Sequence, residues 1–309
     1  MSKKIVLFDH DGGLDDYLAL MLLLTMEHVE IAGIVVTPAD CYIDPAVSAT
    51  RKILDLMGKS HIPVAQSTVR GLNPFPRAFR KTSFQVDHLP ILNQQETLSA
   101  PLAAESGQEF MARVLLEAPQ PLTLLETGPM TTLAAALDIA PEIESKIERI
   151  LWMGGALDVP GNISHYFDGN QDGSAEWNVY WDPPAAHQVW QTSIPVTLCP
   201  LDITNKVKVT SEFVRRLGRQ RQYPLSDLAG QCYALVMHQD YFFWDVLTTA
   251  YLGRPDLFQL RQVETVIIPT GPSQGRTKIQ AGGKKIDVLD SVDVEAFYEY
   301  MLAQWAKQF

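Results

Sequence analysis

Residues 5–16 read IVLFDHDGGLDD, in which four apolar side chains precede four aspartates within eight positions. The apolar run is typical of a buried strand, the paired glycines of a tight turn, and the Leu-, Ala- and Met-rich residues 14–25 of a helix. Carboxylates packed this closely repel one another, and the cost rises as the local dielectric falls. A hard divalent cation with oxygen ligands offsets that repulsion, and open α/β sheets bind ligands at the carboxyl ends of their strands. The segment therefore predicts a metal site at the end of the first strand.

A purely structural role for these aspartates is the alternative interpretation. One of them would cap the helix at its N-terminus, and another would favour the positive end of the helix dipole. Such roles account for Asp15 or Asp16 but leave Asp9 and Asp11 unexplained. The metal site is therefore the better hypothesis.

Strand-like and helix-like segments alternate along the chain. Strand-like runs occupy residues 5–8, 29–37, 62–66, 122–127, 147–153 and 194–198. One helix-like stretch begins near residue 14, and others cover residues 45–57 and 107–116. Past residue 210, helical segments cover residues 211–217, 225–252 and 292–307, with strand-like pieces at 263–269 and 284–288. This order predicts an α/β fold with an open, mostly parallel central sheet, helices on both faces and a helical C-terminal elaboration. Because no low-complexity linker interrupts the sequence, we expect a single domain over residues 1–309.

The composition and net charge restrict the kinds of molecule that this chain is expected to bind. The chain has 309 residues, of which 46% are hydrophobic and 20% charged, as in ordinary globular proteins. Its net charge is −11, and the nearest approach to a basic cluster, Arg215, Arg216, Arg219 and Arg221, fits a solvated helix end. An acidic chain without a basic stripe argues against a nucleic-acid partner. No run approaches membrane-spanning length, so no membrane partner is expected.

The cysteines and the N-terminus indicate the compartment. Cys41, Cys199 and Cys232 are an odd number without paired spacing, which predicts reduced thiols and neither a disulfide framework nor a zinc site. The apolar stretch at the N-terminus is too short for a secretory signal. We therefore expect a cytoplasmic protein.

Two long loops hold side chains suited to binding. Residues 71–106 are unusually long for a connection, which often means a lid or binding loop, and they include Phe79. After residue 153, a second loop contains Asn162, Glu176 and Asn178, which are rarely buried without partners. These groups suit the recognition of sugar hydroxyls, which need both donors and acceptors.

Aromatic residues flank these groups, and a further aspartate lies near the C-terminal part. Trp177, Tyr180 and Trp181 fit the core better than a ligand platform. Asp245 follows Trp244 and precedes a helical run. Alone it would be an N-cap, but beside the N-terminal aspartates it becomes a candidate ligand for a metal or a hydroxyl group.

Two families share the motif at the end of the first strand. An apolar strand followed by Asp-x-Asp-Gly-x-Leu resembles the nucleophile motif of haloacid-dehalogenase-type phosphatases, in which Asp9 would be the nucleophile and Asp11 the acid/base, with bound magnesium. That family usually carries Thr or Val where Gly13 stands, and it needs a later Lys and an acidic pair that this sequence does not offer. Asp15 and Asp16 have no role in that reaction.

The whole chain resembles the nucleoside hydrolases, whose signature Asp-x-Asp-x-Gly-x-Asp-Asp follows the first strand. Further matching blocks occur in family order: Thr127-Gly128-Pro129, Met153-Gly154-Gly155, Gly161-Asn162, Glu176-Trp177-Asn178 and Trp244-Asp245. Trp244 stands where inosine–uridine-type members carry a His. With the Asn-Pro-Phe-Pro run at residues 73–76, the chain looks most like the purine-preferring inosine–adenosine–guanosine branch.

The resemblance implies a set of roles for particular residues. A calcium ion would be bound by Asp11, Asp16, the backbone carbonyl of Thr127 and Asp245, an all-oxygen set. Asp11 would take the proton of a metal-bound water, which would attack the anomeric carbon of an oxocarbenium-like sugar. The ribose would be held by Asp15, Asn162, Glu176 and Asn178, and the base would face Asp40, Phe79 and Trp244.

The source of the leaving-group proton stays open at the sequence level. Stacking between Trp244 and Phe79 would stabilise a protonated purine by ~0.5–2 kcal/mol, which cannot supply the catalysis alone. His10 or a chain of waters are further candidates. The implied partner is a small-molecule purine ribonucleoside, and the implied assembly is a homodimer or homotetramer. A nucleoside-binding protein without turnover is the non-enzymatic alternative, which the complete set of metal ligands disfavours.

Overall fold

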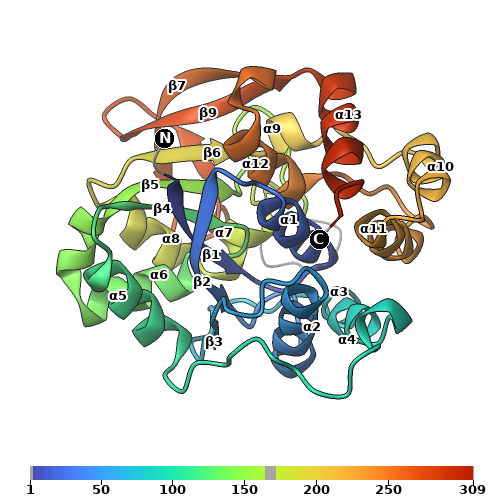
Figure 1. Ribbon diagram of the computed structural model, residues 1–309. Helices are drawn as coiled ribbons and strands as arrows, with labels where there is room; N and C mark the ends of the chain where they lie inside the picture. Colours follow the sequence, from blue (N-terminus) through green and yellow to red (C-terminus); the bar gives the residue numbers. More distant parts are fainter. Residues whose placement is uncertain (1–2, 164–171, 309) are drawn as a thin grey trace.

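The computed structural model describes residues 3–163 and 172–308, in which nine strands form one sheet (Figure 1). The strand order is β3-β2-β1-β4-β5-β6-β9-β7-β8. The strands are β1 (Lys4–His10), β2 (Val29–Val36), β3 (Val64–Gln66), β4 (Leu122–Glu126), β5 (Ile147–Met153), β6 (Val196–Cys199), β7 (Phe258–Ile267), β8 (Thr277–Ile279) and β9 (Lys284–Val292). Pairing is parallel from β3 across to β9, whereas β7 is antiparallel to both β8 and β9. The predicted open, mostly parallel sheet is confirmed.

Helices cover both faces of this sheet. They are α1 (Leu14–Leu24), α2 (Ile43–Leu56), α3 (Arg77–Arg80), α4 (Thr82–Asp87), α5 (Gly107–Glu117), α6 (Thr131–Ile139), α7 (Trp177–Trp181), α8 (Pro183–Trp190), α9 (Leu201–Thr204), α10 (Ser211–Arg219), α11 (Pro224–Ala234), α12 (Trp244–Gly253) and α13 (Val294–Trp305). Short 3₁₀ turns are η1 (Pro90–Leu92), η2 (Pro141–Lys146) and η3 (Pro255–Leu257). One hydrophobic core joins the sheet to α1, α2, α11, α12 and α13, and a second joins it to α5, α6 and α8.

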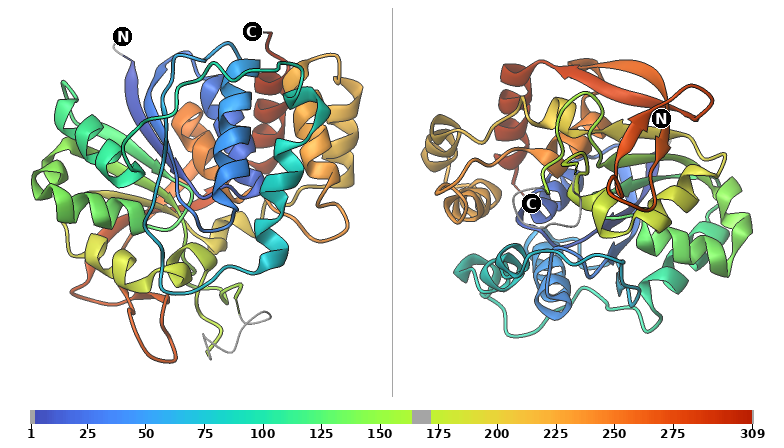
Figure 2. Two further views of the ribbon diagram at one scale, coloured as in Figure 1. Left: turned by 90° about the horizontal axis from the view of Figure 1, so that it is seen from below. Right: turned by 180° about the vertical axis from the view of Figure 1, so that it is seen from behind.

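The strand order changes direction at β1. From β1 the chain proceeds outward through β2 to β3, and the later strands β4, β5 and β6 extend the sheet on the other side. In open α/β sheets, ligands bind outside the carboxyl ends of the strands at such a reversal. The connections that follow these strands lie together at the bottom of the left view in Figure 2. The aspartates after β1 therefore lie at the favoured place for a ligand.

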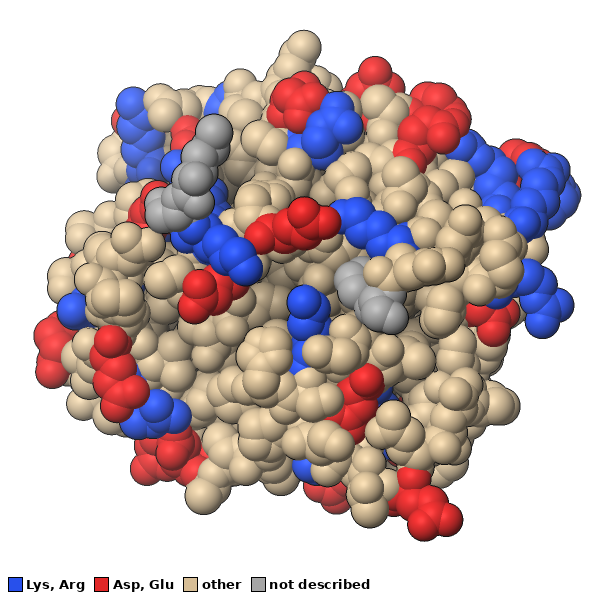
Figure 3. Space-filling model, in the orientation of Figure 1, with Lys and Arg blue, Asp and Glu red and all other residues tan. Residues whose placement is uncertain are grey.

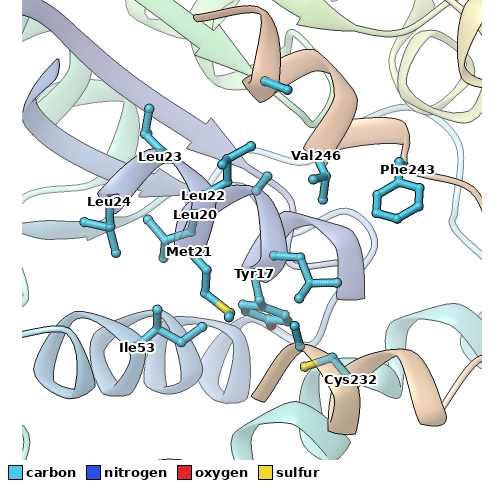
Figure 4. Close-up of a cluster of buried hydrophobic side chains, with 14 of the residues drawn as sticks. Tyr17, Leu20, Met21, Leu22, Leu23, Leu24, Ile53, Cys232, Phe243 and Val246 are labelled. Carbon is cyan, nitrogen blue, oxygen red and sulfur yellow. The ribbon is translucent and has the colours of Figure 1, made fainter. Parts of the chain in front are cut away.

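Helix α1 is buried on nearly all sides. Ten of its residues are buried, and the exception among its 11 residues is Asp15. Figure 4 shows its side chains between Ile53 of α2, Cys232 of α11 and Val246 of α12. A helix that is apolar all round must lie inside the molecule. This packing holds the N-terminus of α1, and the carboxylates on it, against α12.

Several segments differ from the sequence-based prediction. Residues 71–106 contain α3, α4 and η1 and are anchored by the buried side chains of Phe75 and Val86, so they are not a wholly irregular loop. The helical run predicted over residues 225–252 is two helices, α11 and α12. Between them Phe242 forms an isolated bridge with Lys208. These breaks depend on tertiary contacts that the local sequence does not encode.

The arginine-rich segment noted in the sequence belongs to the surface of α10 and the turn after it. Arg216 pairs with Glu295 and Glu299 of α13, and Arg215 and Arg219 pair with Glu212. In Figure 3 this basic group lies at the right edge, and acidic and basic side chains are interspersed on the face shown. In the part of the chain that the structure describes, no helix is long and apolar enough to cross a membrane.

Candidate functional site

The turn between β1 and α1, residues 9–16, is here called the aspartate loop. Gly12 adopts the left-handed conformation, with φ of 75°, and its N–H donates to Nδ1 of His10 over 3.2 Å. The N–H of Gly13, the N-cap residue, donates to Oδ2 of Asp16 over 2.7 Å. Asp16 therefore satisfies a backbone donor at the start of α1, so the structural interpretation is partly correct for this residue.

Carboxyl groups from separate parts of the chain converge on the aspartate loop. A Cβ atom at Gly13 would lie 3.0 Å from Oδ2 of Asp40, 3.2 Å from Oδ2 of Asp16 and 3.3 Å from Oδ1 of Asp15. Asp40 follows β2, and Asp245 arrives in the first turn of α12. Burial and the neighbouring carboxylates raise the pKa of Asp245 well above its usual value. The bare glycine leaves room for this concentration of oxygen atoms.

Burial is the largest cause of the pKa shifts in this cluster, and like charge adds to it. The pKa of Asp11 is raised by burial and then by the charges of Asp16 and Asp40. Burial and Asp15 raise the pKa of Asp16 to about 7. Arg80 is a cation that opposes these shifts, because it lowers the pKa of Asp40, although burial raises that pKa by more. The arrangement favours a positively charged ligand, because such a ligand would stabilise all the carboxylates at once.

Thr127, at the end of β4, connects the aspartate loop to the neighbouring strand. Its hydroxyl donates to Oδ1 of Asp16, and its N–H donates to the carbonyl of Asp9 over 3.0 Å. The next residue, Gly128, passes so close that a Cβ there would lie 2.8 Å from Cβ of Asp11. Thr127 and Gly128 therefore fix the positions of both predicted acidic ligands in this loop.

The predicted ribose-binding residues lie on the loop that precedes α7 and on α7 itself. Glu176 is the N-cap of α7, and its carboxylate accepts the N–H groups of Asn178, Val179 and Gly155. Burial raises the pKa of Glu176 to about 7. Asn162 accepts the N–H of Trp177 through its side-chain oxygen over 3.2 Å. Both side chains thus hold the backbone around α7.

Asn178 links α7 to the ends of β4 and β5. Its side-chain NH2 group donates to the carbonyl of Thr127 over 2.9 Å and to the carbonyl of Met153 over 3.0 Å. The carbonyl that the family resemblance assigns to calcium therefore already accepts one hydrogen bond, and its second lone pair remains for a cation. The amide oxygen of Asn178 is the part of this side chain left to meet a hydroxyl group.

The aromatic side chains near the site form two groups. Phe79 of α3 meets Trp177 edge-on at 5.8 Å between ring centroids, and Phe75 meets Trp177 at 5.1 Å. In the second group, Trp244 meets Tyr241 edge-on at 4.7 Å between ring centroids. The indole nitrogen of Trp244 is buried and has no hydrogen-bond partner. As predicted, Trp177, Tyr180 and Trp181 are buried.

Tyr241 is a site residue that the sequence reasoning missed. Its hydroxyl donates to Oδ1 of Asp15 over 3.0 Å, across 226 positions of sequence. The signal was its place three residues before Trp244, in the aromatic run that precedes α12. Tyr241 thus orients one of the carboxylates at the aspartate loop.

Asp9 and His10 point into the protein and not toward a ligand. Asp9 is fully buried, and its Oδ1 accepts the hydroxyl of Thr37 over 2.8 Å. The nucleophile of a phosphatase must be able to reach its substrate. The buried position of Asp9 therefore argues against the phosphatase alternative. His10 is fully buried as well, and burial lowers its pKa to about 3. The suggestion that His10 protonates the leaving base is therefore wrong.

The oxygen atoms of the predicted ligands are of the kind that bind a hard cation. They are not positioned as a finished coordination shell. Carboxylates and a backbone carbonyl are the oxygen ligands that calcium takes, in flexible geometry. Among residues 3–163 and 172–308, no three His, Cys, Asp or Glu side chains already stand as a group of metal ligands. The structure thus brings the predicted ligands to one place, and a cation would have to draw them together.

Comparison with known proteins gives a consistent result. The model of the inosine-uridine preferring nucleoside hydrolase family matches residues 6–299. The chain is 32% identical over 266 residues to the pyrimidine-specific ribonucleoside hydrolase RihA of Citrobacter koseri, covering 82% of this chain and 80% of that one. It is 30% identical to the RihA protein of Shewanella woodyi, covering 98% of each chain.

Solved structures agree with the fold. The inosine-uridine preferring nucleoside hydrolase from Bacillus anthracis superposes with a TM-score of 0.95 at 43% identity, over 99% of this chain and 100% of that one. The purine-preferring ribonucleoside hydrolase from Gardnerella vaginalis has a TM-score of 0.79 at 24% identity, over 98% of each chain, which supports the fold alone. The names of the relatives thus include enzymes of both base preferences.

Proposed function

The chain belongs to the inosine-uridine preferring nucleoside hydrolase family and hydrolyses the N-glycosidic bond of nucleosides, and on that premise we propose that its substrates are purine ribonucleosides and its metal is calcium. The observation that carries the calcium proposal is the convergence of carboxylates at Gly13, with Asp40, Asp16 and Asp15 oxygens 3.0–3.3 Å from a Cβ position there. Asp11, Asp16, Asp245 and the carbonyl of Thr127 would hold the ion. Bound there, calcium would supply a positive charge that lowers the pKa of a nearby water and attracts ribose hydroxyls.

The chain's own residues would then divide the work of hydrolysis. Asp11 would take a proton from the attacking water, as a general base within hydrogen-bonding reach. The water oxygen would bond to the anomeric carbon while the carbon–nitrogen bond to the base breaks, through an oxocarbenium-like sugar. Asn162, Glu176 and Asn178 would hold the ribose, and Asp15, oriented by Tyr241, would accept from its hydroxyls. The departing base would take up a proton from solvent and leave as the free purine, which balances the proton that Asp11 removes from the attacking water.

The purine preference rests on Trp244 and Phe79. The N–H of an indole is far too weak an acid to protonate a departing pyrimidine, whereas its ring offers a broad surface to a fused two-ring base. Stacking of a base on an aromatic side chain is worth about 1–3 kcal/mol in nucleic-acid binders. Asp40, whose Oδ1 is buried without a partner, would accept a hydrogen bond from the base. The named relatives from Citrobacter koseri and Shewanella woodyi favour the other candidate, a preference for pyrimidine nucleosides.

A substrate panel distinguishes the two preferences. We expect kcat/KM for inosine, adenosine or guanosine to exceed that for uridine and cytidine by at least ~100-fold, or about 2.7 kcal/mol. The replacement Trp244→Ala should reduce this ratio mainly by slowing the purines, and Asp11→Asn should abolish hydrolysis of every substrate. Release of reducing sugar with calcium present is the measurement. Equal or faster hydrolysis of uridine would show that the purine assignment is wrong while leaving the hydrolase assignment intact.

A further inference from the structure

His10 is held inside the molecule by two hydrogen bonds, one at each ring nitrogen. Nδ1 accepts the N–H of Gly12 over 3.2 Å, and Nε2 lies 3.1 Å from the hydroxyl oxygen of Thr50 on α2. The ring stacks on Phe8 of β1 at 5.1 Å and meets Tyr17 of α1 edge-on at 6.0 Å. His10 thus contacts three of the elements around the aspartate loop, namely β1, α1 and α2.

The hydrogen bonds define a single arrangement of protons. An amide N–H can only donate, so Nδ1 of His10 carries no hydrogen and the ring hydrogen is on Nε2. The hydroxyl of Thr50 donates its own hydrogen to the carbonyl of Ala46 over 2.9 Å and is therefore free to accept from His10. Every hydrogen has one acceptor, and neither the ring nor the hydroxyl can turn without losing a buried hydrogen bond.

The backbone at Gly12 needs this support. Gly12 is in the left-handed region, and a Cβ there would lie 2.7 Å from Cβ of Cys41 and 2.9 Å from Cβ of Ala46. The loop is thus pressed against the start of α2, and its N–H would be buried without a partner if Nδ1 of His10 were removed. A buried unsatisfied donor costs about 1–3 kcal/mol, so the loop would open or shift.

We propose that His10 is a positioning residue that fixes the aspartate loop between β1 and α2, and so sets the directions from which Asp11 and Asp16 approach the calcium site. This inference rests on the calcium site proposed above. His10 contacts neither substrate nor ion. Its effect passes through the Gly12 backbone to the carboxylates on either side of that residue. Outer partners of metal ligands typically contribute 10–100-fold to metal affinity or activity.

Three variants test the two hydrogen bonds, and a fourth is the control. His10→Asn keeps an acceptor near the position of Nδ1 but is too short to reach Thr50, while His10→Leu removes both contacts. Thr50→Val removes the hydroxyl that accepts from His10, together with its hydrogen bond to the carbonyl of Ala46, and keeps the volume of the side chain. The matched control is Thr204→Val on α9, which removes a buried hydroxyl that has no partner.

Calcium affinity is measured by titration calorimetry well below the unfolding temperature, and kcat and KM for inosine are measured at saturating calcium. We expect His10→Leu to weaken calcium binding by ~10-fold or more and to lower kcat more than it raises KM. His10→Asn should recover most of the calcium affinity, Thr50→Val should lie between them, and Thr204→Val should match the wild type.

A merely structural role would lower the melting temperature without changing the calcium affinity of the folded protein, and that result would overturn the inference. If His10→Leu does not fold, Thr50→Val decides by the same readouts. A wild-type protein that hydrolyses nucleosides without binding calcium would overturn the calcium proposal itself, and this inference with it.

Discussion

At the scale of single residues, the buried carboxyl groups of this site carry an electrostatic cost. Asp245 is buried in the first turn of α12, where burial and the charges of Asp15 and Asp16 all raise its pKa. A buried carboxyl group beside other carboxyl groups destabilises the folded chain unless something positive joins it. The calcium ion proposed for this site would supply that positive charge.

Replacing Asp245 tests whether its carboxyl group destabilises the calcium-free protein. Asp245→Asn removes a like charge and lets the amide donate to Asp15, so we expect the calcium-free variant to melt a few degrees higher, with about 1 kcal/mol corresponding to ~2–4 °C. Calcium should no longer raise the melting temperature, and kcat/KM should fall by at least ~100-fold. The measurement is thermal unfolding with excess EGTA and with calcium.

The control for Asp245 is the exposed Asp138 of α6, which accepts from Gln188. Asp138→Asn should leave melting temperature, calcium shift and activity unchanged. If the Asp245→Asn protein has a lower melting temperature than the wild type in EGTA, the Asp245 carboxyl group does not destabilise the calcium-free protein, and this interpretation is wrong.

At the scale of elements, the ends of β1 and β4 and the start of α7 form one connected unit. The carbonyl of Thr127 accepts from Asn178 on α7, and Gly128 touches Asp11 after β1. Trp152 on β5 adds to the unit by donating through its indole N–H to the carbonyl of Gly128 over 2.9 Å. The close approach of β1 and β4 at this point is possible only because residue 128 has no side chain.

Adding one methyl group at this contact should therefore displace Asp11. In Gly128→Ala the new Cβ would lie 2.8 Å from Cβ and 3.2 Å from N of Asp11, closer than van der Waals contact allows. We expect calcium affinity to fall by ~10-fold or more while the protein stays folded. Calcium titration and kcat for inosine are the measurements.

Gly218→Ala on α10 is the matched control, because nothing lies within 4 Å of its Cβ position. That replacement should stabilise the protein by about 0.5–1 kcal/mol through helix propensity and leave calcium binding unchanged. Wild-type calcium affinity in Gly128→Ala would show that the close approach of β4 does not position Asp11.

At the scale of the whole molecule, the core around α1 leaves the cysteines without access to solvent. Cys41, Cys199 and Cys232 are free and buried. Burial raises the pKa of Cys199 and of Cys232 to about 12, and it raises that of Cys41 well above its ordinary value. Only the thiolate reacts rapidly with disulfide reagents.

The thiols should therefore be unreactive in the native protein. Because their pKa values are raised, the thiolate fraction at pH 8 is smaller in the folded than in the unfolded chain, and it stays small until the pH approaches the raised values. We expect an aromatic disulfide reagent to release no chromophore from the native protein at pH 8. In 6 M guanidinium chloride the same reagent should count three thiols, as the sequence requires. One thiol reacting at once in the native state would contradict the buried placement.

The alternation of apolar runs and helical segments determined the parallel part of the sheet, because period and turn chemistry are local properties of the chain. The same is true of the aspartate loop, since repulsion between neighbouring carboxylates needs no knowledge of the fold. The strand predicted over residues 147–153 has the same first and last residues as β5, and α1 begins at Leu14 as the sequence predicts.

Tertiary structure alone decided which distant groups meet. Tyr241 reaches Asp15, Asn178 uses its amide on Thr127, and His10 turns inward to Thr50, each through a contact between segments far apart in sequence. The order β9-β7-β8 at the sheet edge and the helix at residues 177–181 likewise depend on packing against the rest of the protein. The local sequence supplies the chemical groups. Which groups meet is decided by how the helices and the sheet pack on their hydrophobic cores, because long-range contacts there outweigh local preference.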